Sequence, residues 1–423
     1  MPPAPAPSQR SWEIDAARGL MLLLMTVTHL PTRLTSPLGQ PFGFVSAAEG
    51  FVLLSAYMAG MVYGRVAWRK SVAEMHHAFW RRALKIYACH AALLLFLFTV
   101  IAFIGIRIEQ PAVVDLLNFY IQQPFTALVG GLLLLYEPPL LDILPLYVLF
   151  MLASPWVMVL AFVWGWRPVM VVSGLLWLLA QFGLSHWVYD GINAIVPLPV
   201  PFSETGAFVM WSWQFLWMLG LWMGATRNDP NAPAFTFPRW SVLLAIALAI
   251  FLLGWRHLVG QIPFHPEGPY AAFNPWFDKW ALGPMRMINL FALLLLAIHY
   301  GPGLARSMPR QRWLETLGSA SLPVFCAHLV LVLLVLAGLG AKYERPWLQD
   351  IALLAACFGV LYAVARATLW LERQQKEDAA PPAVLAPGQK RPPMYPPAPS
   401  RTARSAQGES DGGMKERAFS GRC

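Results

Sequence analysis

Long apolar segments that are almost free of charged residues dominate this sequence and leave it few possible folds. Several of them run for 18 or more residues, and 57% of all residues are hydrophobic while only 13% are charged. A soluble domain does not tolerate such segments, whereas about 20 apolar residues in a helix span the hydrocarbon core of a bilayer. The sequence therefore predicts an all-α, polytopic integral membrane protein.

The apolar segments predict about ten transmembrane helices. The expected ranges are 15–31, 47–64, 83–106, 143–164, 168–187, 207–225, 240–257, 281–300, 319–339 and 349–372. Residues 107–142 separate the third and fourth of these, and their apolar middle, Phe125 to Tyr136, is short and bounded by prolines. We expect this middle to form a re-entrant or interfacial helix, with a full span as the weaker alternative.

Lysine and arginine are concentrated in alternate loops, and most acidic residues lie in the opposite ones. The positive-inside rule then places the N-terminus in the cytoplasm, and an even number of spans returns the C-terminus to the same side. Residues 1–10 and 373–423 are rich in proline, alanine and polar residues, so we expect disordered tails there. Residues 11–372 remain as one transmembrane domain in contact with the lipid bilayer.

Composition also argues against two kinds of site. The net charge of +9 is not the footprint of a nucleic-acid partner, because the basic residues cluster in loops and in the C-terminal tail. The four cysteines show neither zinc-ligand spacing nor a disulfide framework, and we expect no metal site.

The first apolar segment carries three ionisable residues on one face. Asp15 and Arg18 are three residues apart, and the eleven residues from Arg18 to His29 complete an almost whole number of helical turns. A charge inside a membrane helix points to function by default, and His29 is placed to act as a base near the opposite end. In the alternative interpretation, Asp15 and Arg18 only mark the cytoplasmic boundary of the helix.

Two further sets of charges accompany this helix. If the first two helices form a hairpin, Glu49 lies at the outer face close to His29, and its carboxylate would set the tautomer of the imidazole. In the alternative interpretation, Glu49 is an interfacial acid exposed to water. Arg81 and Arg82, with Lys85, can place cations on one turn at the cytoplasmic mouth, which suits a phosphorylated ligand. The positive-inside rule explains the same charges without a ligand.

Other polar residues in the apolar segments are candidates for the walls of a binding cavity. Interhelical hydrogen bonding is the alternative role for Gln214 and Asn289. Arg286 is the hardest to dismiss, because a cation in an apolar helix is unfavourable without a partner. The candidates are Tyr147, Gln214, Arg286, Asn289, Ser321 and His328.

The order and spacing of these motifs resemble a known family. Asp15-x-x-Arg18-Gly19 with His29 resembles the first-helix motif of the acyltransferase-3 superfamily of membrane acyltransferases. Across residues 10–372 the chain more closely resembles the OpgC family, bacterial inner-membrane proteins associated with succinylation of osmoregulated periplasmic glucans. Ala56 departs from the family's sequence pattern, which has glycine in a Ser-Gly-Tyr turn of the second helix. The resemblance rests on Ile14-Asp15 to His29, Ala47 to Tyr57, Ile143 to Tyr147, Trp213-Gln214 and Leu317-Gly318 to His328.

The resemblance implies an O-acyltransferase with acyl-CoA, in particular succinyl-CoA, as co-substrate and no bound cofactor. Arg81 and Arg82 would hold the CoA phosphates, and Arg18, paired with Asp15, would act on the donor or the oxyanion. His29, oriented by Glu49 or another acid, would deprotonate a hydroxyl of an extracytoplasmic glycan. The sequence does not choose between direct attack of this hydroxyl and a relay through an acyl-His intermediate. A succinyl carboxylate needs a cation, for which Arg286 is the candidate. The competing class is a proton-coupled transporter of a small anion or glycan precursor, which uses the same residue types.

Overall fold

The structure is a computed structural model that describes residues 12–227, 236–341 and 345–378. The chain divides into a first unit, residues 1–373, and a second unit, residues 374–423. Of the second unit, only the last residues of a helix, 374–378, are described. The predicted N-terminal tail and nearly all of the predicted C-terminal tail lie outside the described residues.

The described residues form helices and one isolated β-bridge, between Phe42 and Val45, so the all-α class is confirmed. Seven helical segments in the described ranges are long and apolar enough to cross a membrane. They are α3 (Ala47–Arg69), Val72–Arg107, α9 (Ile143–Trp164), α13 (Arg239–Leu258), α14 (Pro284–Ser307), α16 (Ser321–Leu339) and residues Trp347–Gln375 of α17 (Trp347–Asp378).

A bent pair, α10 (Trp166–Gln181) and α11 (Leu184–Ile195), makes an eighth candidate span, with 82° between its halves. The prediction of one helix over 168–187 was therefore wrong in detail, since Gly183 interrupts it with a φ of 91° that favours glycine. Two expected spans, α1 (Trp12–His29) and α12 (Met210–Thr226), fall outside this set of candidates. The first carries Glu13, Asp15 and Arg18 and the second has 17 residues, so a total of ten spans stays a prediction.

The third expected helix starts eleven residues earlier than predicted. It begins at Val72 and runs through α4 (Val72–Phe96), a π-helical segment (Leu97–Ile101) and α5 (Ala102–Arg107). Ser71 accepts a hydrogen bond from the Glu74 amide and so caps the N-terminus. The basic segment with Arg81 and Arg82 is therefore helical.

Residues 107–142 contain only short helices, as their length and prolines predicted. These are α6 (Pro111–Leu116), α7 (Asn118–Gln122) and α8 (Pro124–Leu132). The nine residues of α8 are too few to cross a bilayer, so the full-span alternative is wrong. Tyr87 and His90 of α4 hydrogen-bond to the carbonyl oxygens of Leu132 and Gly131 and hold the end of α8 against α4.

The remaining short elements lie in loops or at the ends of long helices. Residues expected to start the ninth span at 319 are divided between a separate helix and α16. These elements are α2 (Thr35–Leu38), two 3-10 helices (Phe202–Glu204 and Ala271–Phe277) and α15 (Arg312–Ser319).

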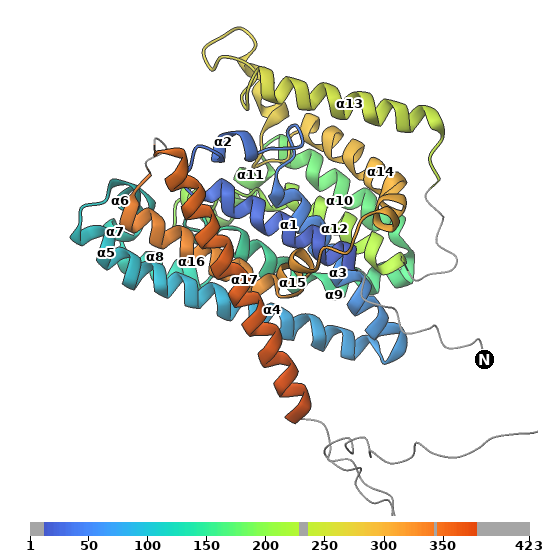
Figure 1. The fold of residues 1–423 in the computed structure, drawn as a ribbon, viewed down its shortest axis with the longest axis horizontal. Helices are drawn as coiled ribbons and strands as arrows, with labels where there is room; N and C mark the ends of the chain where they lie inside the picture. Colours follow the sequence, from blue (N-terminus) through green and yellow to red (C-terminus); the bar gives the residue numbers. More distant parts are fainter. Residues whose placement is uncertain (1–11, 228–235, 342–344, 379–423) are drawn as a thin grey trace, which may run out of the picture. The chain divides into compact units, whose positions relative to one another are not determined.

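Close helix contacts through small residues bring the functional helices together. α1 contacts α3, α15 and α16 and lies among them in Figure 1. A Cβ on Gly318 of α15 would lie 1.8 Å from the Asp15 carbonyl oxygen of α1, so only glycine permits this approach. α12 packs along α3 in the same way. Gly220 of α12 faces Ala56 of α3, and because Gly220 has no side chain it leaves room for the Ala56 methyl group. The alanine at position 56, where glycine was expected, is therefore accommodated.

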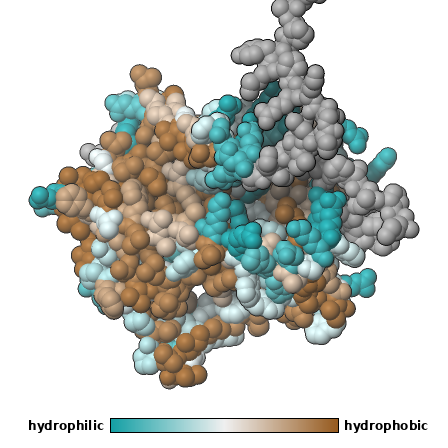
Figure 2. Space-filling view, turned by 90° about the horizontal axis from the view of Figure 1, so that it is seen from below, coloured by the Kyte–Doolittle hydropathy of each residue, from teal (hydrophilic) through white to brown (hydrophobic). Residues whose placement is uncertain are grey.

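The surface of the first unit carries many large apolar side chains. Leu258, Ile195 and Trp68 are each at least 80% exposed, which is unfavourable in water and favourable in lipid. Figure 2 shows one face on which hydrophobic residues form a broad surface beside hydrophilic patches. Together with the apolar helices, this surface confirms the polytopic membrane class.

Candidate active site

One face of α1 carries the first part of the site. Asp15, Arg18, Leu22 and Met25 are buried, as the helical spacing predicted, and His29 is the last residue of the helix. Arg18 Nη1 lies 3.7 Å from Asp15 Oδ1, which confirms the predicted ion pair. The guanidinium also donates to the Gly318 carbonyl oxygen over 3.3 Å and to the Ser321 hydroxyl. The α1–α15 contact therefore fixes where Arg18 points.

Arg18 opens into a pocket between α1, α3, α4, α9 and α16, which we call the Arg18 pocket. Its accessible volume is about 160 Å³, and its wall is mainly apolar. Its polar lining residues are Arg18, Ser55, Tyr63, Arg82, Tyr147 and Ser321. A narrow apolar cavity with two arginines suits a ligand that carries a neutral chain and an anionic group.

His29 forms a hydrogen-bonded pair with His328 of α16. Nδ1 of His29 lies 3.2 Å from Nε2 of His328, and Nδ1 of His328 lies 2.6 Å from the Phe325 carbonyl oxygen. A carbonyl only accepts, so His328 carries its proton on Nδ1 and its neutral ring accepts at Nε2. His29 must then donate from Nδ1, which leaves its Nε2 with a lone pair. This arrangement is that of a general base with a fixed tautomer.

His29 faces a second, larger pocket, which we call the His29 pocket. It has a volume of about 510 Å³ and lies between the ends of α1, α3 and α9 and the segments around residues 115–119, 203–208 and 279–280. Its charged and aromatic lining residues include Asp115, Phe119, Glu137, Asp142, Glu204 and Lys279, with Phe208 and Trp280. Flat aromatic faces beside carboxylates suit a hydroxyl-rich ligand such as a sugar.

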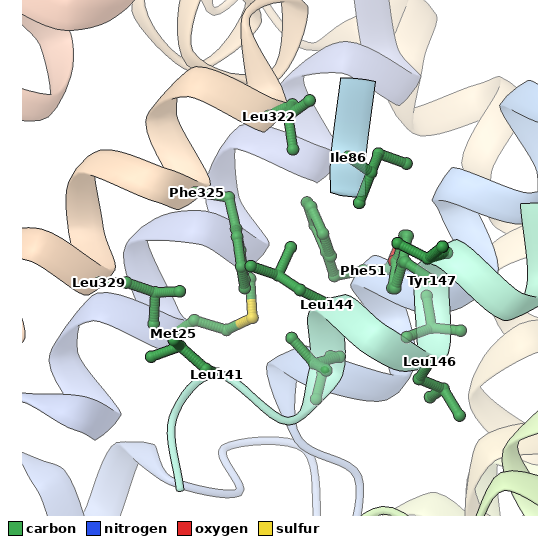
Figure 3. Packing of buried hydrophobic residues seen from close by; sticks show 14 of the residues in the cluster. Met25, Phe51, Ile86, Leu141, Leu144, Leu146, Tyr147, Leu322, Phe325 and Leu329 are labelled. Carbon is green, nitrogen blue, oxygen red and sulfur yellow. The ribbon is translucent and has the colours of Figure 1, made fainter. Parts of the chain in front are cut away.

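The Arg18 pocket and the His29 pocket share two lining residues, Ile143 and Phe325. Phe325 is 3% exposed and stacks on Phe51 with ring centroids 5.8 Å apart. Figure 3 shows Phe325, Met25 and Leu144 converging from α16, α1 and α9. Apolar side chains therefore line the boundary between the two pockets, between Arg18 and His29.

Glu49 does not lie beside His29 as the sequence predicted, because its carboxylate serves another cation. Glu49 Oε1 accepts from Nη2 and Nε of Arg286 over 2.7 and 3.2 Å, and both side chains are about 1% exposed. The other oxygen accepts from the Ser46 amide over 3.0 Å and caps α3. His328 takes the place next to His29 that was expected for Glu49.

The same ion pair removes Arg286 from the predicted role of binding a succinyl carboxylate. Its guanidinium is neutralised by Glu49 and also donates to the Phe277 carbonyl oxygen, 3.4 Å away. Asn289, one turn further along α14, accepts from the Phe44 amide over 2.8 Å and holds the loop before α3. These two residues position α3 and its preceding loop around the site.

Gln214 has the alternative, interhelical role. Its amide donates to the Ser173 carbonyl oxygen over 2.8 Å and accepts from the Ser173 hydroxyl over 2.7 Å, which joins α12 to α10.

Tyr147 lines the Arg18 pocket and donates to the Phe51 carbonyl oxygen over 3.3 Å. Arg81 is exposed and lies 2.7 Å from a His77 ring nitrogen, so of the predicted pair only Arg82 lines this pocket.

Three residues of the His29 pocket were not singled out from the sequence as site residues. Burial raises the pKa of Glu137 well above its ordinary value and raises that of Asp142 to about 6, while burial lowers the pKa of Lys279. In the sequence they are ordinary loop charges. The only sequence signal was that acidic residues gather in the loops on one side.

Family comparison agrees with the resemblance in the sequence. A family model described as OpgC protein matches residues 10–373, which is most of the chain. Searches for similar characterised proteins and for similar solved structures gave no significant match. The matched range contains every residue of the Arg18 pocket and the His29 pocket. The chain therefore belongs to the OpgC family.

Proposed function

We propose that this protein is an inner-membrane O-acyltransferase of bacteria that transfers an acyl group, in particular succinyl, from cytoplasmic acyl-CoA to glucan hydroxyls outside the cytoplasm. The observation that carries the proposal is the position of His29. Its ring forms a hydrogen-bonded relay with His328 and lies at a pocket that shares the lining residues Phe325 and Ile143 with a second, arginine-containing pocket. An enzyme that joins donor and acceptor from opposite sides of a membrane needs such an arrangement.

The donor would enter through the Arg18 pocket. Its apolar wall suits the pantetheine arm, and Arg82 at its lining would pair with a phosphate, helped by the neighbouring cations of α4. Arg18 is held by Asp15, Ser321 and Gly318, so its charge is preorganised. This preorganised cation would hold the donor while the acyl end of the donor reaches His29.

The acceptor would occupy the His29 pocket. Nε2 of His29 removes the proton of a sugar hydroxyl while the oxygen attacks the thioester carbonyl. The attack forms the carbon–oxygen bond of the new ester, and the carbon–sulfur bond of the thioester then breaks. The proton on His29 passes to the leaving thiolate of CoA. His328 stays neutral through its bond to the Phe325 carbonyl and accepts from His29 throughout. Family membership supports this reaction class and offers nothing to a proton-coupled transporter.

The test is to analyse periplasmic glucans by anion exchange in a bacterial host that lacks its own glucan acyltransferase. The host carries the wild type, His29→Ala, or His299→Ala, which removes an exposed histidine of α14, at matched membrane levels. We expect the wild type and His299→Ala to add acidic, base-labile substituents and His29→Ala to add none. Unmodified glucans with the wild type overturn the proposed function. Substituents with His29→Ala retain the enzyme class and reject His29 as the base.

A further inference from the structure

A short, well-anchored loop presents Lys279 to the His29 pocket. The loop joins the 3-10 helix at Ala271–Phe277 to α14, and the Gly283 amide closes it by donating to the Asp278 carbonyl oxygen over 2.9 Å. Side chains of α10 and α12 donate to three successive carbonyls of the loop. These bonds are Trp213 to Trp280 (2.9 Å), Gln181 to Ala281 (2.8 Å) and Trp177 to Leu282 (3.0 Å). The position of the Lys279 backbone is therefore fixed.

The Lys279 ammonium lies at the pocket without a carboxylate in ion-pair contact among the described residues. Lys279 lines the His29 pocket and also an adjoining pocket, in both cases together with Thr28, His29 and Gly39. Its Nζ lies 4.5 Å from the centroid of the Trp280 ring. Among the described residues no carboxylate lies within 4.0 Å of it, whereas the guanidinium of Arg286 is paired with Glu49.

Charges around Lys279 are consistent with a ligand role. Burial lowers its pKa, and the attraction of Glu49 opposes this effect, so the ammonium is partly desolvated. Asp142 of the same pocket also attracts the ammonium, although it lies beyond ion-pair distance. A cation that is partly stripped of water and held beside the candidate base gains most from a carboxylate on the ligand.

We propose that Lys279 binds the free carboxylate of a dicarboxylic acyl group while the thioester carbonyl of that group lies beside His29. Lys279 is thus the residue that selects a charged, succinyl-like donor over an uncharged acyl chain of the same length. This inference rests on the proposed acyltransferase function and deepens it by naming the residue that selects the donor. It also replaces Arg286, whose charge Glu49 already neutralises, in the role that the sequence assigned to it.

The test compares two donors on the purified protein in lipid nanodiscs. Succinyl-CoA and butyryl-CoA have four-carbon acyl groups that differ in the terminal carboxylate, and a short glucan oligosaccharide serves as acceptor. Ester formation is measured for the wild type, Lys279→Met and Lys279→Arg. The matched control is Arg33→Met, which removes a cation of the adjoining pocket that lies over the Trp347 ring at 5.6 Å.

We expect Lys279→Met to lower kcat/KM for succinyl-CoA by about 10- to 100-fold and to leave butyryl transfer within about twofold, since one charge-assisted contact is lost. Lys279→Arg should recover most of the succinyl activity, and Arg33→Met should behave as the wild type. The butyryl rate in the same preparation reports whether the variant is folded. An equal loss for both donors, or unchanged selectivity, overturns the role of Lys279 and leaves the acyltransferase standing. A wild type inactive with both donors overturns the proposed function and this inference with it.

Discussion

His29 and His328 are 299 residues apart in the chain, yet their rings stack at 18° with centroids 5.4 Å apart and Nδ1 of one lies 3.2 Å from Nε2 of the other. His29 donates to His328, and His328 donates to the Phe325 carbonyl oxygen. Because a carbonyl cannot donate, the whole relay has one direction. It leaves the outer nitrogen of His29 as the acceptor that a general base requires.

His328 is accordingly a positioning residue, and replacing it with leucine should lower kcat by about 100- to 1000-fold, because His29 loses the acceptor that fixes its tautomer. KM for the glucan acceptor should stay within about twofold. Steady-state kinetics with purified protein measures both. The control is His90→Leu, which removes another buried histidine bonded to a carbonyl oxygen, in this case from α4 to Gly131 of α8. A His328→Leu enzyme with wild-type kcat would show that the relay has no part in the reaction.

The contact between α1 and α15 should tolerate no side chain at Gly318. An added Cβ would overlap the Asp15 carbonyl oxygen, so Gly318→Ala must push α15 away from α1 and weaken the bond from Arg18 to the Gly318 carbonyl. We expect a loss of stability of about 1–3 kcal/mol and strongly reduced activity. Gly338→Ala in α16 is the matched control, because nothing lies within 4 Å of its Cβ. Thermal melting in detergent distinguishes the two, and equal melting temperatures would contradict the prediction.

The buried pair of Glu49 and Arg286 should be more sensitive to losing one member than to losing both. Glu49→Gln or Arg286→Met leaves a buried charge without its partner, which costs about 3–5 kcal/mol. The double variant Glu49→Gln/Arg286→Met removes that charge and should melt at a higher temperature than the Glu49→Gln single variant. Size-exclusion profiles after heating give the ranking. If the double variant is the least stable of the three, the pair stabilises the fold beyond charge neutralisation.

Asp142 should make the protein less stable as the pH rises. Burial raises the pKa of this carboxyl to about 6, above the value near 4 of an unfolded chain. The folded state therefore binds the proton more tightly, and this contribution is complete below pH 4 and is lost as the pH rises through about 6. Its size is on the order of 3 kcal/mol.

Asp142→Asn, whose amide resembles the protonated acid, should flatten the dependence of the melting temperature on pH between 4 and 7. Asp190→Asn, which removes an exposed carboxylate of α11, should keep the slope of the wild type. Melting curves at several pH values decide the matter. An Asp142→Asn protein with an unchanged slope would mean that another group titrates in this range.

Several features followed from the sequence because they depend on local properties of the chain. Hydropathy alone predicted the membrane class, since apolar length is read directly from the sequence. Helical periodicity predicted that Asp15, Arg18 and His29 share one face of one helix, and the salt bridge and the burial of that face agree. The limits of the apolar segments gave two wrong helix ends. The helix expected to begin at residue 83 begins at Val72, after the capping residue Ser71. The helix expected to continue to residue 187 is interrupted at Gly183.

The partners of these residues were decided only by the tertiary structure. His29 meets His328 rather than Glu49, Glu49 meets Arg286 across 237 residues, and Lys279 reaches the His29 pocket from a loop. Each contact depends on which helices pack together and how closely, and glycines such as Gly318 set that distance. In lipid, apolar helix faces are equally favourable against tails and against other helices, so hydrophobic pattern does not specify helix neighbours. The sequence determined what each helix carries, and close packing of the helices determined which groups meet.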